Sequence, residues 1–312
     1  MAHTLGLIGL GKMGGNMARR LAKGGIQAAL LDQDTALAVT VARETGGAAA
    51  LDLPELVAQL QAPRVVWVML PSGAITEQTL EALRGLLSPG DTVVDGANSN
   101  YRDSVRRAAN FEAQGMHYVD AGVSGGIHGL AHGYCLMVGG TEAAVAQVAP
   151  FLRVLATGRG QEGDGSSGWL HVGPAGAGHF TKMVHNGIEY GMMQSLAEGF
   201  ALMSAKQEFN LDIAAIAELW RHSSVVRSWL LDLSADFLKN DQKLESIAPV
   251  VADSGEGRWT ALESINLGVP TPVMTLALMS RFASQGKGDF ANQMLAMMRK
   301  GFGGHMVEKE ST

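Results

Sequence analysis

Short apolar runs alternate with helix-like segments through the first half of the chain. The apolar runs have the length of strands and are rich in aliphatic or β-branched residues; they occupy 5–9, 28–31, 65–70 and 92–95. The segments between them suit helices at 13–23, 34–45, 74–87 and 101–113. Because fully apolar strands alternating with helices are typical of α/β proteins, we predict a parallel sheet with helices on both faces.

The pattern changes in the second half. Strands are expected at 118–122 and 134–139 and a helix at 141–155, before a stretch rich in Gly, Ser and Asp at 156–172 that suits a domain junction. No clear strand follows, and helices are expected at 176–206, 210–221, 228–240, 258–267 and 271–285. The prediction is an α/β domain over residues 1–172 and an all-α domain over residues 173–312.

A glycine-rich turn joins the first strand to the first helix. It is made up of Gly9, Leu10, Gly11, Lys12, Met13 and Gly14. In dinucleotide-binding folds, the first glycine of this spacing permits the turn, the second lets a pyrophosphate approach the backbone, and the third packs helix against strand. Free N–H groups at the helix start then face the phosphates. We therefore expect a Rossmann-type domain that binds a dinucleotide through these six residues.

A carboxylate follows the second strand. Asp32 can accept hydrogen bonds from both hydroxyls of the adenosine ribose and would repel a 2′-phosphate. Asp34 adds negative charge, and no arginine is near. The cofactor expected is NAD rather than NADP. The alternative is that Asp32 only caps the next helix.

Composition excludes several classes of protein. Charged residues make up 17% and hydrophobic residues 46%, which is typical of a globular chain rather than a disordered one. The net charge of −6 gives no basic field for nucleic acid or an anionic membrane. The lone cysteine, Cys135, lies in an apolar run and is expected to be a buried core thiol in a reducing compartment. With no signal-like or membrane-spanning stretch, we expect a soluble, cytoplasmic protein.

The long helix carries the candidate chemistry. Five polar residues fall at i, i+3, i+4, i+7 and i+8 and so share one face, namely Lys182, His185, Asn186, Glu189 and Tyr190. The apolar positions between them point elsewhere and are expected to pack into the domain, namely Phe180, Met183, Val184 and Ile188. A base and an acid two turns apart could act on one small polyol. The alternative is a solvated surface face with a Lys/Glu pair.

These residues carry a resemblance to a known family. The run Lys-Met-Val-His-Asn-Gly-Ile-Glu-Tyr at 182–190 resembles the signature of the decarboxylating 6-phosphogluconate dehydrogenases. Segments 95–99, 120–126 and 220–228 also resemble that family, whose short, NAD-preferring branch is the nearest in form. The resemblance implies oxidation and decarboxylation of 6-phosphogluconate to ribulose 5-phosphate, with Lys182 as base, Glu189 as acid and no metal. It also implies a place in pentose phosphate or gluconate metabolism.

The resemblance also implies substrate contacts. The carboxylate and hydroxyl end would be held by Asn98, Ser124, Gly125, Gly126, His185 and Asn186, with Asn98 also at the nicotinamide end of the cofactor. Tyr190 and Arg281 would meet the phosphate. Arg299 and His305 would reach the active site of a neighbouring subunit, which implies a homodimer or a dimer of dimers. For Arg299, the alternative is a solvated cation at a helix end.

Two further features of the sequence concern the phosphate site and a possible metal site. Where long-form members of the family place a phosphate-binding lysine and threonine, this chain has Ser254 and Glu256, and a glutamate beside a phosphate dianion is repulsive unless it points away or pairs with Arg258. An unphosphorylated sugar acid is therefore a second possible substrate. His128 and His132 lie four residues apart but in a glycine-rich loop, so zinc is not expected.

Two other functions stay open at this point. A β-hydroxyacid dehydrogenase of the 3-hydroxyisobutyrate type shares the glycine turn, the Ser-Gly-Gly loop and the helix lysine, but it lacks the Glu-Tyr pair and does not decarboxylate. A non-catalytic NAD-binding sensor has no need of an acid and a base on one helix.

Overall fold

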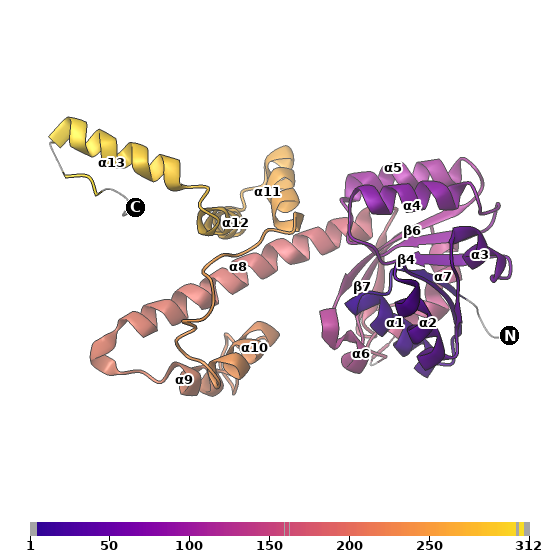
Figure 1. The fold of residues 1–312 in the computed structure, drawn as a ribbon, viewed down its shortest axis with the longest axis horizontal. Coiled ribbons are helices and arrows are strands. Elements are labelled where there is room, and N and C mark those ends of the chain that lie inside the picture. Colours follow the sequence, from indigo (N-terminus) through magenta and orange to yellow (C-terminus); the bar gives the residue numbers. More distant parts are fainter. Residues whose placement is uncertain (1–4, 159, 162, 304–305, 309–312) are drawn as a thin grey trace. The chain divides into compact units, whose positions relative to one another are not determined.

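The chain forms two compact units (Figure 1). The computed structural model describes residues 5–158, 160–161, 163–303 and 306–308. The N-terminal unit comprises residues 1–183 and the C-terminal unit residues 184–312. The long helix α8 (Ala177–Ala205) contributes its first turns to the N-terminal unit and the rest to the C-terminal unit. The domain boundary expected after residue 172 stays a prediction.

The N-terminal unit is built on one eight-stranded sheet with the order β3-β2-β1-β4-β5-β6-β7-β8. The strands are β1 (Leu5–Ile8), β2 (Ala28–Leu31), β3 (Ala48–Ala49), β4 (Val65–Val68), β5 (Thr92–Asp95), β6 (His117–Ser124), β7 (Cys135–Gly140) and β8 (Trp169–Gly173). All neighbouring strands are parallel except β6 and β7, which are antiparallel. The chain turns between these two through a 3₁₀ turn (Gly126–His128) and the one-turn helix α6 (Gly129–His132), too short for a parallel crossover.

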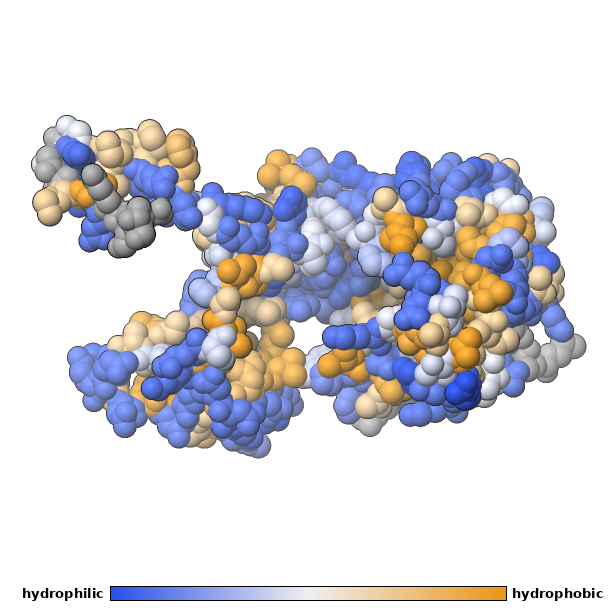
Figure 2. All heavy atoms as spheres, viewed as in Figure 1, coloured by the Kyte–Doolittle hydropathy of each residue, from blue (hydrophilic) through white to orange (hydrophobic). Residues whose placement is uncertain are grey.

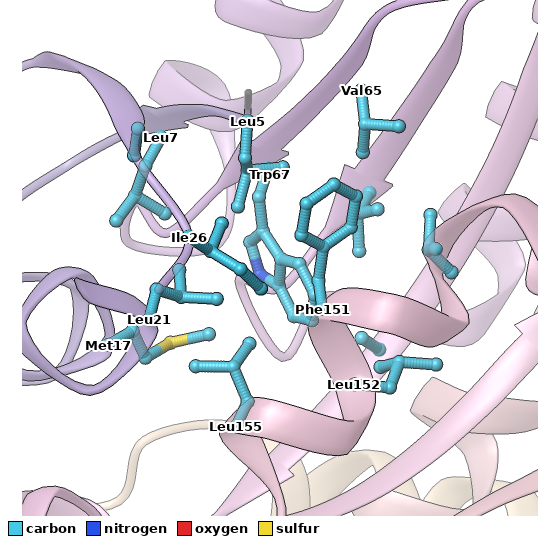
Figure 3. Close-up of a cluster of buried hydrophobic side chains, with 14 of the residues drawn as sticks. Leu5, Leu7, Met17, Leu21, Ile26, Val65, Trp67, Phe151, Leu152 and Leu155 are labelled. Carbon is cyan, nitrogen blue, oxygen red and sulfur yellow. The ribbon is translucent and has the colours of Figure 1, made fainter. Parts of the chain in front are cut away.

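Helices cover both faces of this sheet, so the predicted Rossmann-type architecture is confirmed. On one face lie α1 (Lys12–Lys23), α2 (Thr35–Thr45) and α7 (Glu142–Leu155). Figure 3 shows part of that core, where Trp67 of β4 lies among Leu21, Phe151 and Leu155. On the other face lie α3 (Leu53–Ala58), α4 (Ala74–Arg84) and α5 (Tyr101–Glu112).

Five elements of this unit were not predicted, namely β3, α3, the 3₁₀ turn Gly126–His128, α6 and β8. The strand β8 lies at the end of the stretch interpreted as a junction. It pairs with β7, with Trp169 opposite Leu136, and the Trp169 side chain is buried. A five-residue strand among glycines has too short an apolar run to be recognised; its pairing with β7 stabilises it.

The C-terminal unit is helical, as predicted. After α8 come a 3₁₀ turn (Gln207–Phe209), α9 (Ile213–Trp220), α10 (Trp229–Leu238), α11 (Glu256–Leu267), α12 (Pro272–Ser284) and α13 (Asp289–Gly303). One small core joins α9 and α10 with Phe200 and Met203 of α8. A second joins Tyr190 of α8 with α11 and α12. The helix α13 lies beyond the helices that the sequence pattern predicted.

The prediction of a buried Cys135 is wrong, because the thiol is exposed. Side chains alternate between the two faces of a strand, and Tyr134, Leu136 and Val138 fill the core on one face of β7. The start of α8 covers the opposite face near Met137 and Gly139, whereas Cys135, the first residue of β7, is exposed. Among the described residues, no helix combines the length and the apolar character needed to cross a membrane.

Candidate active site

The glycine-rich turn connects β1 to α1. The surroundings of each of its three glycines show what a side chain would meet there. Gly9 has φ +88°, and a Cβ there would lie 2.5 Å from the Met69 carbonyl oxygen. A Cβ at Gly14 would overlap the carbonyl oxygen of Gly9. A Cβ at Gly11 would meet open space, at the start of α1. This backbone can therefore be approached closely by a ligand at the helix N-terminus.

Asp32 connects the end of β2 to this turn. Its carboxylate accepts hydrogen bonds from the N–H of Leu10 at 2.6 Å and from the N–H of Asp34 at 2.9 Å. The N-cap of α2 is Asp34, whose side chain accepts from the N–H of Leu37 at 3.0 Å. Asp32 therefore does not serve as the cap, and a carboxylate has about four acceptor positions, so two ribose hydroxyls can still bind.

A pocket of about 450 Å³ lies beside Asp32. Aliphatic side chains form its walls, as an adenine ring requires; they belong to Leu31, Leu51, Leu53, Leu70 and Ile75. Asp52 adds a second carboxylate, and the lining, all within the described part of the chain, holds neither lysine nor arginine. The residues present therefore fit the adenosine half of NAD and would repel a 2′-phosphate.

Asn98 holds two strand ends together. It follows β5 with φ +51°, its Oδ1 accepts from the N–H of Val123 at 2.9 Å, and its Nδ2 donates to the Val123 carbonyl at 3.2 Å. Ser124 comes next, followed by Gly125 and Gly126 with φ +129° and +51°. The side chain of Asn98 thus fixes the point where the predicted substrate loop begins.

A buried polar cluster beneath Asn98 was missed by the sequence analysis. Asp95 is fully buried and accepts from Arg107 at 2.8 Å and from the Tyr118 hydroxyl at 2.8 Å. It also accepts from the N–H of Ala97 at 3.0 Å, which shapes the 95–98 turn. Burial and the nearby Asp95 carboxylate raise the pKa of Tyr118 well above its usual range. Asp95 lies within the 95–99 motif, but its partners Arg107 and Tyr118 lie outside that motif.

Asp120 anchors the first turn of α8 to the sheet. It is fully buried, and its two oxygens accept from the N–H groups of Gly176 at 2.6 Å and His179 at 2.7 Å. The ring of His179 in turn lies 2.7 Å from the Ser104 hydroxyl of α5. This carboxylate from β6 acts as a distant cap for α8, a role that the sequence analysis also missed.

Glycines let α8 lie directly on the strands. A Cβ at Gly178 would lie 2.5 Å from the carbonyl oxygens of Asp120 and Met137. A Cβ at Gly122 would lie 2.5 Å from the Cβ of Lys182. Lys182 therefore lies against the β6 backbone, and only 5% of it is exposed.

The next two turns of α8 carry the other predicted residues. The His185 Nδ1 lies 3.1 Å from the Asn186 Oδ1 and 3.8 Å from a Glu189 carboxylate oxygen. Tyr190 is buried, and its ring covers Gly257 of α11. The apolar face was predicted correctly at Met183, which is buried, but wrongly at Ile188, which is 51% exposed. On the neighbouring polar face, Lys182 and Tyr190 are buried and Glu189 is only partly exposed, whereas the side chains of a solvated surface face would all be exposed.

The remaining candidate residues come from parts of the chain other than α8. Arg281 of α12 lies over the ring of Tyr190, whereas Arg299 is an exposed residue of α13. His305 lies outside the described residues. His128 and His132 are exposed. Within the described ranges, no group of three or more His, Cys, Asp or Glu side chains is arranged to hold a metal ion.

Family models match both halves of the chain. Residues 4–166 match the NAD binding domain of 6-phosphogluconate dehydrogenase, and residues 178–311 match the C-terminal domain of 6-phosphogluconate dehydrogenase. A relative from Haloferax volcanii is named 6-phosphogluconate dehydrogenase, NAD(+)-dependent, decarboxylating; it is 38% identical over 307 residues, covering 98% of this chain and 99% of the relative. A Bacillus subtilis protein of the same name is 34% identical over 92% of this chain and 62% of its own length.

Solved structures give the same picture. A Plasmodium falciparum 6-phosphogluconate dehydrogenase matches with a TM-score of 0.82 and 26% identity, over 99% of this chain and 67% of that one. A Mycobacterium tuberculosis 3-hydroxyisobutyrate dehydrogenase matches with a TM-score of 0.71 over 93% and 94% of the two chains, at 21% identity. The second match shows a shared fold.

Proposed function

Because the chain belongs to the 6-phosphogluconate dehydrogenase family, we propose that it oxidises and decarboxylates 6-phosphogluconate to ribulose 5-phosphate and CO₂. Family membership makes it an NAD-binding oxidoreductase. The observation that carries the specific reaction is α8, on which Lys182 and Glu189 lie two turns apart. The name of the full-length Haloferax volcanii relative supports the same reaction.

Lys182 is proposed as the general base. NAD, when bound, supplies the hydride acceptor. As the neutral amine, Lys182 takes the proton of the substrate's 3-hydroxyl while the C3 hydrogen leaves as hydride, which makes a β-keto acid. The carboxylate then leaves as CO₂, and its bonding electrons form the C2=C3 double bond of an enediol while the C3 carbonyl oxygen takes back the proton held by Lys182. The packing of Lys182 against Gly122 supports this role, because it fixes the stem of the side chain that carries the base.

Glu189 is proposed as the acid of the second half of the reaction. It protonates C1 of the enediol, the former C2 of the substrate, while the hydroxyl on the neighbouring carbon returns its proton to Lys182, which gives ribulose 5-phosphate. Its carboxylate is partly exposed and lies 3.8 Å from the His185 ring, so the imidazole can orient it. A proton donor must reach the substrate, and Glu189 on this face meets that need better than a buried carboxyl would.

Substrate binding is assigned to the residues predicted from the sequence. We propose that Asn98, Ser124, Gly125, Gly126, His185 and Asn186 bind the carboxylate and hydroxyl groups. Tyr190 and Arg281 bind the other end of the substrate, which carries the phosphate in 6-phosphogluconate. The Asn98 hydrogen bonds to Val123 support the first assignment, because they fix the loop next to Ser124. The Arg281 guanidinium over the Tyr190 ring supports the second.

We also propose that the chain works as a homodimer or a dimer of dimers, with Arg299 and His305 reaching the partner's active site. The helix α13 supports this, because it presents a row of exposed apolar side chains at i, i+4, i+7 and i+8, namely Phe290, Met294, Met297 and Met298. Figure 2 shows the apolar residues of this helix in tan and orange. Apolar surface of this extent is typical of a surface that a second protein chain covers. The cytoplasmic location stays a prediction.

The replacement Lys182→Met tests the proposed base. It keeps the length of the side chain and removes the amine, so we expect turnover of 6-phosphogluconate to fall by about 10³-fold or more, with NAD affinity nearly unchanged. NADH formation, CO₂ release and calorimetric NAD binding measure these effects. The matched control Lys206→Met removes an exposed lysine just beyond α8 and is expected to keep full activity. Near-normal turnover in Lys182→Met would exclude this lysine as the base.

The same assay separates the other possible functions. NADH formation without CO₂ release from 3-hydroxyisobutyrate would indicate a simple β-hydroxyacid dehydrogenase. No turnover of 6-phosphogluconate, gluconate or 3-hydroxyisobutyrate would indicate a binding protein instead.

A further inference from the structure

A chain of hydroxyl and carboxyl groups lies at the N-terminus of α11, within the C-terminal unit. The Tyr190 hydroxyl lies 3.2 Å from the Ser254 hydroxyl, which donates to the Glu256 carboxylate at 2.6 Å. Tyr190 is held rigidly, because its ring covers Gly257, where any side chain would overlap it. Ser254 is exposed, so a ligand can reach this chain from solvent.

Cations and carboxylates are mixed around this chain of groups. Arg281 lies with its guanidinium carbon 3.5 Å from the centre of the Tyr190 ring and donates to the Ala252 carbonyl at 2.7 Å. Arg258 is paired with Asp253 at 2.7 Å. Arg258 is thus engaged by Asp253, and Glu256 places a second carboxylate next to Ser254. Lys287 is a further cation, and its amine lies over the Phe282 ring that Arg258 also covers. Glu256 therefore offsets part of the positive charge that a phosphate dianion would meet here.

A phosphate bound here would compete with Glu256 for the hydrogen bond that the Ser254 hydroxyl donates. The Ser254 hydroxyl has one hydrogen, which it gives to Glu256. If that hydrogen turned to a phosphate oxygen, the Glu256 carboxylate would lose its partner and face a dianion a few ångströms away. A sugar hydroxyl makes no such demand, because it can donate its own hydrogen to Glu256 and accept from Arg281 while Ser254 keeps its bond to Glu256.

We propose that Glu256 is a specificity-determining residue that weakens phosphate binding at this end of the substrate and admits unphosphorylated sugar acids as further substrates. This inference rests on the proposed function, since it concerns the far end of the same substrate. The substrates would then be aldonic acids that carry either a phosphate or a hydroxyl at the end opposite the carboxylate.

The test compares wild type with Glu256→Gln, which removes the charge and keeps the shape. We measure kcat/KM for 6-phosphogluconate and for gluconate, both with NAD. The ratio of the first to the second is expected to rise about tenfold in Glu256→Gln, from removal of one like charge at close range. The control Glu245→Gln removes an exposed charge elsewhere in the same unit and is expected to leave the ratio unchanged.

Two results would overturn the inference: a ratio that stays the same or falls in Glu256→Gln, or wild-type protein that does not oxidise gluconate. A calorimetric titration with inorganic phosphate in the presence of NAD tests Glu256 without turnover, and binding is expected to tighten severalfold in Glu256→Gln. If wild-type protein failed to release CO₂ from 6-phosphogluconate, the proposed function would be wrong, whereas the phosphate titration would still decide the role of Glu256.

Discussion

Asp120 connects the sheet to the helix that carries the proposed base. One of its oxygens accepts the N–H of Gly176, just before α8, the other accepts that of His179 in the first turn, and no part of the side chain is exposed. A buried carboxylate of this kind is stable only because donors surround it. Lys182 follows His179 by less than one turn. The position of the base therefore depends on a carboxylate that does not itself need to touch the substrate.

Replacing Asp120 by Asn tests this dependence. The amide keeps one acceptor but turns an NH₂ group toward a backbone N–H, so we expect a loss of about 1–3 kcal/mol in the free energy of unfolding. Urea-induced unfolding measures this loss, and kcat for the NAD-linked reaction is expected to fall with it. The control Asp212→Asn changes an exposed N-cap of α9, where Asn caps a helix as well as Asp does. Equal stability losses in the two variants would contradict the role of Asp120.

The local part of the site was predictable at the scale of residues, and the long-range part was not. The spacing of Gly9, Gly11 and Gly14 and the face of α8 depend on neighbours within one turn or one loop, so the sequence contains them. The partners of Asp95 and the N–H groups held by Asp120 come from segments up to 59 residues away. Cys135 is predicted to be buried but is exposed, because an apolar run does not show which of its positions a neighbouring helix covers.

At the scale of elements, α8 combines two kinds of packing. Its N-terminal glycine, Gly178, lets the helix touch the backbone of β6 and β7. Further along, a Cβ at Gly199 would meet nothing within 4 Å. The two glycines thus differ in their surroundings although both lie in the same helix. Tight packing rather than helix propensity explains the first of them.

A matched pair of alanine variants separates these cases. Gly178→Ala places a methyl group against two carbonyl oxygens, so we expect it to destabilise the protein by about 1–3 kcal/mol and to lower kcat. Gly199→Ala fills open space in a helix and is expected to stabilise the protein by about 0.4–1 kcal/mol. Thermal and urea unfolding measure both changes. A Gly178→Ala variant as stable as the wild type would show that packing at Gly178 is looser than described.

At the scale of the whole molecule, the two units differ in how well they cover apolar surface. The N-terminal unit has two large buried clusters, one on each face of its sheet. The C-terminal unit has two small clusters and many exposed apolar residues, among them Leu262, Ile265 and Leu276 at 54%, 75% and 65% exposure. This contrast supports the proposed association of two chains through the helical unit.

Charges placed on α13 test the proposed association. The double variant Met294→Glu/Met298→Glu puts two carboxylates on the exposed apolar row, so we expect it to shift the protein toward monomer and to lower activity. Light scattering coupled to gel filtration measures the mass. The control Asn292→Glu adds a charge to a different side of the same helix and is expected to leave the mass unchanged. A double variant that keeps the wild-type mass would rule out this row as the interface.

The continuity of α8 limits how this chain can diverge in evolution. Lys182 lies against Gly122, whereas Gly187 faces Thr260 and Tyr190 covers Gly257. One residue inserted between positions 187 and 190 would turn the helix after it by about 100° and advance it by about 1.5 Å. Gly187 and Tyr190 could then no longer both meet α11. We therefore expect this stretch to change among descendants by substitution alone, with its length preserved.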